Sequence, residues 1–171
     1  MKGIKIAIAT QDQDRDSLIV IGKDISAEFD AAMVDSVEAS VIKSVEVFLD
    51  TVDDNVRHKS GSMVAKIIIK GEIPTKSVFR NKFRKLSEWS RDGGEDTQYR
   101  NICIGIRDAD KSFMCVYSIS RVFVVDYREK YLTDDNIKSE FELYLNQEQD
   151  NLDKIFIDND WPKAWDWARK G

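Results

Sequence analysis

The residue types in this chain that most often take part in catalysis or metal binding are one histidine and two cysteines, His58, Cys103 and Cys115. Hydrolytic and redox mechanisms need a base, a nucleophile or a metal cluster held in a fixed arrangement. His58 lies between Arg57 and Lys59 in a charged stretch, which predicts a solvated loop residue and not a catalytic base. The two cysteines lie in strand-like segments without the short spacing of a metal motif. We therefore predict buried structural thiols and no tetrahedral zinc site.

Carboxylates at Asp12, Asp14 and Asp16 have the alternate spacing that begins a calcium-binding loop. The rest of that loop is missing, because its sixth position is Ser17 instead of glycine and its twelfth is Lys23 instead of a bidentate glutamate. A polar hairpin turn explains these aspartates better. The remaining paired aspartates also fall at predicted turns, where the side chain bonds to its own backbone. Each such turn can bind a hard cation, but none specifies one.

Phosphate-binding glycine loops, dinucleotide fingerprints and nucleophile-elbow motifs do not occur in the sequence. One segment is rich in basic residues, which wrap around most of a predicted helix and favour a solvated face, with a phosphate or acidic-partner surface as the minor alternative. These residues are Lys76, Arg80, Lys82, Arg84 and Lys85. We therefore predict no catalytic residue, no cofactor and no metal ligand, and a protein that is not an enzyme.

The composition bounds the class of protein. The chain has 171 residues, of which 42% are hydrophobic and 33% charged, and this predicts a globular fold with a normal core. We expect one β-rich domain over 1–158 and a separate tail over 159–171. A net charge of −5 argues against nucleic acid as the main partner. The apolar runs are too short for a bilayer and no signal peptide is recognised, so we expect no membrane insertion and a cytoplasmic location.

Alternation of apolar and polar residues predicts a mainly β fold, either a β-barrel or two packed antiparallel sheets. Residues 26–41 fit a helix or a strand, and we favour a strand. Residues 53–62 contain almost no apolar side chain and predict a loop. The predicted strands cover residues 4–8, 17–21, 45–49, 63–69, 102–106 and 141–145, and the first two are expected to form a hairpin.

After Pro74 the apolar period changes from two to about 3.6, which predicts one amphipathic α-helix near 75–91. Thr75 is the expected N-cap. Gly93 and Gly94 are expected to end the helical segment, at a position that requires a left-handed residue. The apolar face of this helix is predicted to contain Val78, Phe79, Phe83, Leu86 and Trp89.

Residues 112–131, SFMCVYSISRVFVVDYREKY, alternate like one strand but are nearly three times the typical length of about 5 or 6 residues. A strand of this length must bend, extend beyond its sheet or pair with a neighbouring molecule. One face is predicted to lie in the core and is interrupted by Arg121. That face consists of Phe113, Cys115, Tyr117, Ile119, Phe123, Val125 and Tyr127.

The C-terminal tail, DNDWPKAWDWARKG, differs in character from the rest of the chain. Asp160 followed by Trp161 and Pro162 predicts the start of a short C-terminal helix. Two interpretations stay open for Trp161, Trp165 and Trp167. They dock on the chain's own domain, which is the simpler interpretation, or they anchor the chain in a partner's groove, because tryptophan is enriched in binding hot spots.

The order of these elements resembles the fold of phage tail-tube proteins and of the haemolysin-coregulated tube protein of type VI secretion. The resemblance covers residues 4–145. SFMCVYSISRVFVVDY and FELYLNQ look like the long strand and the closing strand of that superfamily, and VFRNKFRKLSEW takes the place of its single helix.

The resemblance implies a non-enzymatic subunit that assembles into hexameric rings or stacked tubes of a phage-derived or type VI-like contractile injection apparatus. It implies a strand shared across the subunit boundary, sheath, spike or effector proteins as partners, and a place in a phage-like or secreted particle. It further implies that one charged loop contacts the next ring. That assembly loop consists of Asp53, Asp54, Asn55, Val56, Arg57, His58, Lys59 and Ser60.

Two other functions remain open from the sequence. One is a small-ligand or flavin-binding β-barrel lined by Tyr117, Arg121 and Tyr127. The other is a monomeric adaptor that binds a partner through its tryptophan-rich tail.

Overall fold

The computed structural model describes residues 3–9, 19–22, 42–51, 63–73, 77–107, 113–149, 154–160, 163–164 and 166–167. Within these ranges, no helix is long and apolar enough to cross a membrane. The described elements are β1 (Gly3–Ala9), β2 (Ile19–Gly22), β3 (Ile42–Thr51), β4 (Met63–Ile73), α2 (Ser77–Ser90), β5 (Arg100–Arg107), β6 (Phe113–Lys130), β7 (Ser139–Gln147) and β8 (Ile155–Asp158).

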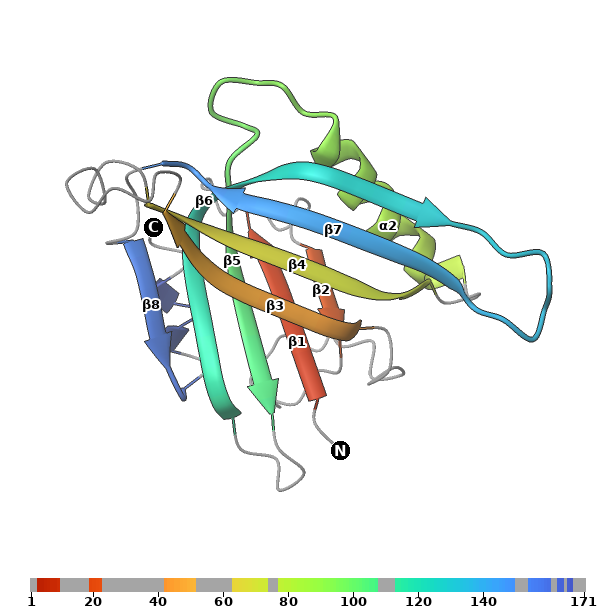
Figure 1. Cartoon of the computed structure of the whole chain (residues 1–171), viewed down its shortest axis with the longest axis horizontal. Coiled ribbons are helices and arrows are strands. Elements are labelled where there is room, and N and C mark those ends of the chain that lie inside the picture. The colour runs from red at the N-terminus through yellow and green to blue at the C-terminus, as the bar shows by residue number, and fades with distance from the viewer. Residues whose placement is uncertain are drawn as a thin grey trace.

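The eight described strands form a single antiparallel sheet in the order β2-β1-β5-β6-β7-β4-β3, and β8 pairs with β6. The sheet curves into a half-barrel, and the long strand β6 belongs to both of its sides (Figure 1). The sequence therefore predicted the mainly antiparallel β class correctly. In the described part of the chain, the two alternatives of a closed barrel and two packed sheets are replaced by one bent sheet.

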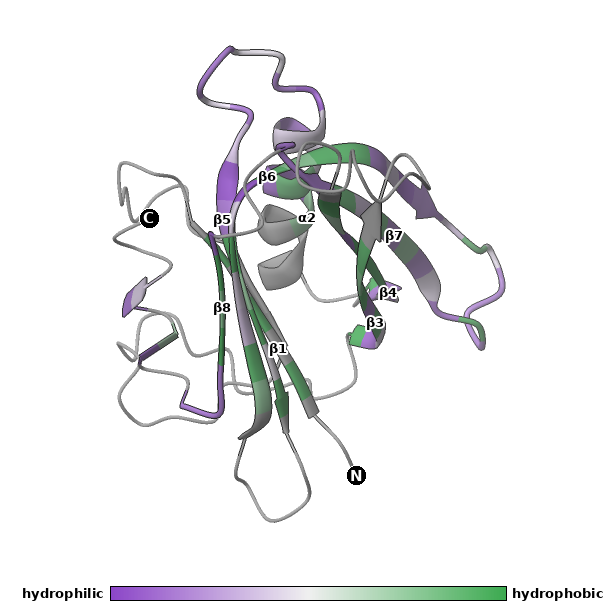
Figure 2. Ribbon diagram, turned by 60° about the vertical axis from the view of Figure 1, so that its left-hand side comes forward, coloured by the Kyte–Doolittle hydropathy of each residue, from purple (hydrophilic) through white to green (hydrophobic). Residues whose placement is uncertain are grey.

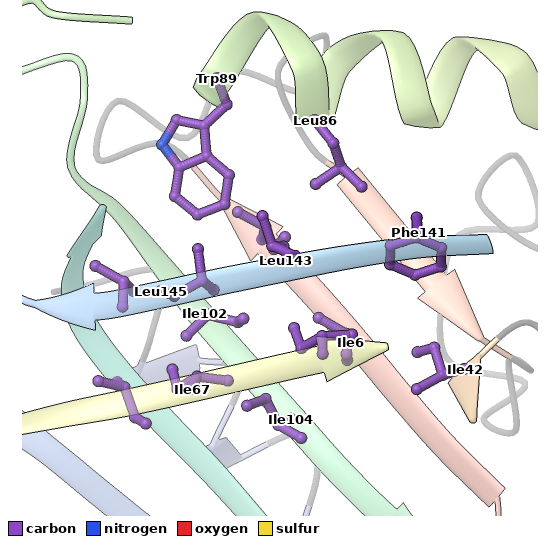
Figure 3. Packing of buried hydrophobic residues seen from close by; sticks show 14 of the residues in the cluster. Ile6, Ile42, Ile67, Leu86, Trp89, Ile102, Ile104, Phe141, Leu143 and Leu145 are labelled. Atoms are coloured by element: carbon purple, nitrogen blue, oxygen red, sulfur yellow. The ribbon is translucent and has the colours of Figure 1, made fainter. Parts of the chain in front are cut away.

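Helix α2 lies in the concave side of the sheet, between β1, β5 and β8 on one side and β3, β4 and β7 on the other (Figure 2). Its apolar face closes the core: Phe83, Leu86 and Trp89 are at most 4% exposed. Phe83 contacts Phe141 edge to face, with 5.0 Å between ring centroids. The helix side chains meet isoleucines and leucines from both sides of the sheet, among them Ile6, Ile67, Ile102, Leu143 and Leu145 (Figure 3).

The predicted helix is confirmed over Ser77–Ser90, whereas its proposed cap Thr75 lies outside the described residues. The expected role of the two glycines is wrong, because neither has a φ in the left-handed region. Asp92 organises the turn instead: its Oδ1 accepts hydrogen bonds from Gly94 N at 2.9 Å and Thr97 Oγ1 at 2.9 Å. A Cβ at position 94 would lie 2.1 Å from Thr97 Oγ1, so a larger residue there would displace this hydroxyl from its hydrogen bond with Asp92.

Five of these six predicted strands are confirmed, and the one at 17–21 is confirmed from Ile19 onward, where the described residues begin. The expected hairpin is present because β1 and β2 pair antiparallel. The predictions for residues 26–41 and 53–62 lie outside the described residues. The sequence analysis missed β8, which has only four residues, IFID. A segment this short gives too few alternations to separate a strand from a loop.

The structure does not establish a second helix in the tail. Its described residues show only the first turn: Lys163 N donates to Asp160 Oδ1 at 3.3 Å, and Ala164 N donates to Asp160 O at 3.1 Å. Asp160 therefore has the contacts of an N-cap, as predicted, and the length of the segment that follows stays a prediction.

Candidate assembly surface

Strand β6 changes partners along its length. Residues 113–120, here called the first half, pair with β5 on one edge and, from Val116 to Ile119, with β8 on the other edge. Residues 122–130, the second half, pair with β7. The overlong strand therefore bends within one subunit, where it passes from one side of the half-barrel to the other (Figure 1).

The bend lies at Arg121, which has a φ of 55°. Left-handed φ values are unfavourable for residues with a Cβ and persist where surrounding contacts hold them. Three backbone contacts do so here. Asn101 Oδ1 accepts from Arg121 N at 3.2 Å, Arg121 O accepts from Glu148 N at 2.8 Å, and Gln147 Nε2 donates to Ser120 O at 3.0 Å. Neighbouring strands thus fix both sides of the bend.

The Arg121 side chain adds a second set of contacts at the bend. Its guanidinium forms an ion pair with Glu148 and lies 4.4 Å from the centre of the Tyr99 ring, which in turn meets Phe123 edge to face. The hydrogen bond to Glu148 raises the pKa of Arg121 above its ordinary value. The guanidinium therefore stays charged, and it lies between Glu148 and the Tyr99 ring at the junction of the two halves of β6.

The bend also changes which residues face the core, and part of the sequence prediction is wrong for this reason. The predicted face holds for Tyr117 and Ile119, but beyond Arg121 the core positions pass to Val122 and Val124. A bulge at Val125 then restores the original alternation, so Tyr127 again packs on the core. Phe123 lies opposite Asn146, on the outer face, and Val125 is 55% exposed.

The second half of β6 has an open edge. Its pairing with β5 ends at Val122, and among the described residues no strand lies beside 123–130 on the edge opposite β7. The other end of the same four-stranded side, β6-β7-β4-β3, is also open within the described part, because β3 pairs only with β4. An unpaired edge presents backbone donors and acceptors that can pair with another strand.

The outer face of this four-stranded side carries cross-strand rows of opposite charges. Glu72 accepts from Lys43 at 2.9 Å and from Lys138 at 3.1 Å, and the hydrogen bond from Lys43 is the main reason why the pKa of Glu72 lies below its ordinary value. Glu142 of β7 lies 3.8 Å from Lys70 of β4 and 4.0 Å from Arg128 of β6. The face also exposes Phe48, which is 39% exposed. It is polar and charge-balanced, with an apolar group at its β3 end.

Two of the predicted site regions lie wholly or partly outside the described residues. The assembly loop 53–60 lies wholly outside them, as do Trp161 and Trp165. Trp167 stacks on Phe156 of β8, with ring centroids 5.7 Å apart. This contact agrees with docking on the chain's own domain for one of the three tryptophans, and the role of a partner anchor stays a prediction.

The residues proposed to line a ligand barrel all have structural partners. Tyr117 and Tyr127 pack against the core, and Arg121 is held by Glu148. Burial and the hydrogen bond from Tyr127 to Glu129 raise the pKa of the Tyr127 phenol. Cys103 is buried and Cys115 half-buried, and both are free thiols. The described residues contain no group of three or more His, Cys, Asp or Glu side chains able to hold a metal.

Comparison with solved structures identifies the fold. Hcp1 from Salmonella typhimurium matches with a TM-score of 0.50 at 10% identity, over 84% of this chain and 81% of that chain. A mutant Hcp1 from the E. coli EAEC 042 pathovar matches with a TM-score of 0.50 at 12% identity, over 92% of this chain and 98% of that one. This chain has the Hcp tube-protein fold.

A chain of the anti-feeding prophage baseplate is also similar to this Hcp-fold chain, with a TM-score of 0.47 at 13% identity over 92% of this chain and 93% of that one. No protein-family model matches the sequence, and no curated protein matches it either. The two Hcp1 matches confirm the sequence resemblance by element order at the level of the fold.

The contacts that hold the bend were not found by sequence reasoning. Asn101, Tyr99 and Glu148 are distant in sequence from Arg121, and none belongs to a recognisable motif. The only available signal was that Arg121 interrupts an otherwise apolar face. That interruption marked the position of the bend in β6 but gave no indication of its backbone geometry.

Proposed function

We propose that this chain is a non-enzymatic structural subunit that assembles with copies of itself into rings or tubes of a contractile injection apparatus. The Hcp fold supports the class of function, since two solved Hcp1 structures match most of the chain. The hexameric number, the stacking of rings, and sheath, spike or effector partners belong to the same proposal.

The observation that carries the proposal is the pair of edges, at the two ends of the β6-β7-β4-β3 side, that no other described strand covers. All three pairings within this side are antiparallel, so β6 and β3 run in opposite directions. A neighbour placed head to tail would set its β3 against residues 123–130 of β6, again antiparallel. Such a heterologous contact continues the sheet from subunit to subunit and closes into a ring when the rotation closes.

The primary test is negative-stain electron microscopy of the purified, tag-free chain across a concentration series, with sedimentation velocity in parallel. We expect rings with a central hole, and stacks of them at higher concentration. Uniform monomers at every concentration would overturn the proposal.

A point variant tests the open edge directly. Val125 has no partner in the β6–β7 register, because Val124 lies opposite Leu145 and Asp126 opposite Tyr144. Val125→Pro therefore introduces a proline into the second half of β6 without replacing a residue of that register. We expect it to abolish rings while near-UV circular dichroism stays unchanged.

The matched control is Val125→Thr, which keeps β-branching and an exposed position. We expect it to form rings like the unmodified chain. If Val125→Pro also forms them, this edge is not the contact between subunits.

The loop prediction has its own test. Residues 53–60 join the end of β3 to the start of β4. Deletion of 54–60 should leave single rings and the fold intact but prevent stacking. Stacks that persist after the deletion would remove this loop from the proposed contact between rings.

A further inference from the structure

The first half of β6 is closed in a way that its second half is not. Residues 116–119 pair with β5 on one edge and with β8 on the other. Val116, Ser118 and Ile119 are fully buried. The strand that closes the second edge is only four residues long and comes from the C-terminal region.

The tail adds a second contact behind this short strand. The turn after β8 is held by Asp158 Oδ1, which accepts from Asn159 N at 2.7 Å and Asp160 N at 3.1 Å. Ser118 alternates with Tyr117 and Ile119, which pack on the core, so its side chain lies on the face of the sheet that points away from the core. There, the fully buried Ala164 accepts a hydrogen bond from Ser118 Oγ at 2.6 Å through its carbonyl oxygen.

Further contacts join the two parts of this segment to each other. Trp167 stacks on Phe156, which lies opposite Ser118 in the strand register. Lys163 Nζ lies 3.9 Å from a carboxylate oxygen of Asp158. The described residues from 154 to 167, here called the C-terminal clip, thus grip β6 at one edge and on one face.

We infer that the C-terminal clip is an edge guard: it occupies residues 116–119 of β6 and so restricts the pairing of β6 with other subunits to its open edge at 123–130. Short edge strands and covering segments are known means of preventing uncontrolled sheet pairing. Without the clip, β6 offers two separate edge stretches to neighbouring molecules. Because they lie on opposite edges and on different sides of the bend, pairing at both cannot produce one closed ring.

The purpose of the guard rests on the proposed function, but its existence does not. An exposed edge at 116–119 should cause irregular association even in a chain that never forms rings. Failure of the unmodified chain to form rings would therefore overturn the proposed function alone. Failure of clip variants to associate would overturn this inference alone.

The test uses two full-length variants that release the clip by different means. Ala164→Arg places a long, charged side chain at a fully buried position of the tail, where Ala164 accepts the hydrogen bond from Ser118. Ile157→Pro interrupts β8 at a side chain that is 58% exposed, so no core packing is lost. The matched control for the added charge is Asn159→Arg, at an exposed position whose side chain makes none of the clip contacts described above.

The first measurement is amide hydrogen exchange followed by mass spectrometry. In both release variants we expect those amides of residues 116–119 that point to β8 to exchange at least about tenfold faster than in the unmodified chain, with residues 141–145 of β7 unchanged. Asn159→Arg should match the unmodified chain. Unchanged exchange at 116–119 in both release variants would overturn the inference, because that edge would not then depend on the clip.

The second measurement is sedimentation velocity with electron microscopy of the same samples. We expect the release variants to show a several-fold larger fraction of heterogeneous, irregular assemblies than the unmodified chain and Asn159→Arg at equal concentration. Faster exchange at 116–119 together with an unchanged assembly distribution would overturn the inference.

Discussion

The two halves of β6 belong to one continuous strand but have opposite surroundings. In the first half, residues 116–119 are paired on both edges and covered on both faces. In the second half, residues 123–130 are paired on one edge only within the part of the chain that the structure describes, and Val125, Arg128 and Lys130 are exposed. The difference shows that length alone does not make a strand available to a neighbour. A strand is available to a neighbour only along an edge with which no other strand of its own chain pairs.

Core truncation should give the largest contrast between the halves. Ile119→Ala removes a fully buried side chain, and we expect it to lower the free energy of unfolding by about 3 kcal/mol because a cavity remains. Val125→Ala in the second half should change it by less than about 0.5 kcal/mol. Urea unfolding followed by circular dichroism measures both. Equal losses would mean that the second half is as well covered as the first.

Substitution of the residue between the halves should give the next largest effect. Arg121→Ala loses the ion pair and the contact with Tyr99 while the strained φ remains, so we expect a loss of about 2 kcal/mol in unfolding free energy. Arg121→Gly loses the same side chain but adopts this φ without strain, and should be more stable than the alanine variant by about 1 kcal/mol.

Arg128→Ala is the control for this pair of variants, because Arg128 makes its ion pair at a side chain that is 65% exposed. Exposed pairs contribute little, so its unfolding midpoint should be nearly unchanged. If the alanine and glycine variants of Arg121 are equally stable, backbone strain does not contribute at the bend.

Two serines on the same face of β6 sharpen the comparison further. Ser118 donates to the Ala164 carbonyl, so Ser118→Ala should cost about 1 kcal/mol of unfolding free energy by leaving that buried acceptor unpaired. Ser120 is equally buried, but its Oγ has no hydrogen-bond partner among the described residues. Ser120→Ala should therefore be neutral or slightly stabilising. If Ser120→Ala lost more unfolding free energy than Ser118→Ala, the hydrogen bond from Ser118 to Ala164 would not be the main attachment of the clip.

The smallest expected effect is the pH dependence contributed by Glu72 on the outer face of the second side. Its pKa in the folded chain is lowered, chiefly by the hydrogen bond from Lys43, from an ordinary value of 4.5. Its stabilising contribution is therefore complete above pH 4.5 and is lost as the pH falls through the lower, folded pKa. Thermal unfolding of Glu72→Gln should differ from that of the unmodified chain at pH 7, and the difference should shrink below pH 4.5.

Added salt provides the check on Glu72, because both of its lysine partners are more than half exposed. The difference in thermal unfolding between Glu72→Gln and the unmodified chain at pH 7 should decrease at about 0.5 M salt. The screening length there is only a few ångströms, so salt weakens exposed charge pairs. A difference that is independent of salt would indicate lost packing instead of lost charge pairing.

Local alternation was enough to predict most of the fold. Ile4, Ile6 and Ile8 in β1, and Phe141, Leu143 and Leu145 in β7, alternate because one face of each strand meets the core. The helix was equally legible, since Phe83, Leu86 and Trp89 follow the helical period. These features depend on residues within one element, and a single sequence contains them.

Features that depend on distant residues could not be predicted in the same way. A φ of 55° at an arginine has no local sequence signal, because glycine or asparagine usually occupies that region. Asn101 and Glu148 impose it from neighbouring strands. The bulge at Val125 and the pairing of β8 are likewise set by register with other strands. The sequence therefore predicted an overlong strand with a bend as one of three alternatives, but it predicted neither the geometry of the bend nor the strand that covers the first half.

The continuity of β6 through Arg121 has a mechanical consequence. Both sides of the half-barrel share this strand, so a load that pulls one side from the other is carried along its covalent backbone. The hydrogen bonds to β5 and β7 are then loaded together in shear instead of opening one by one like a zipper. A subunit built in this way should resist longitudinal force better than one whose two sides met only through side chains.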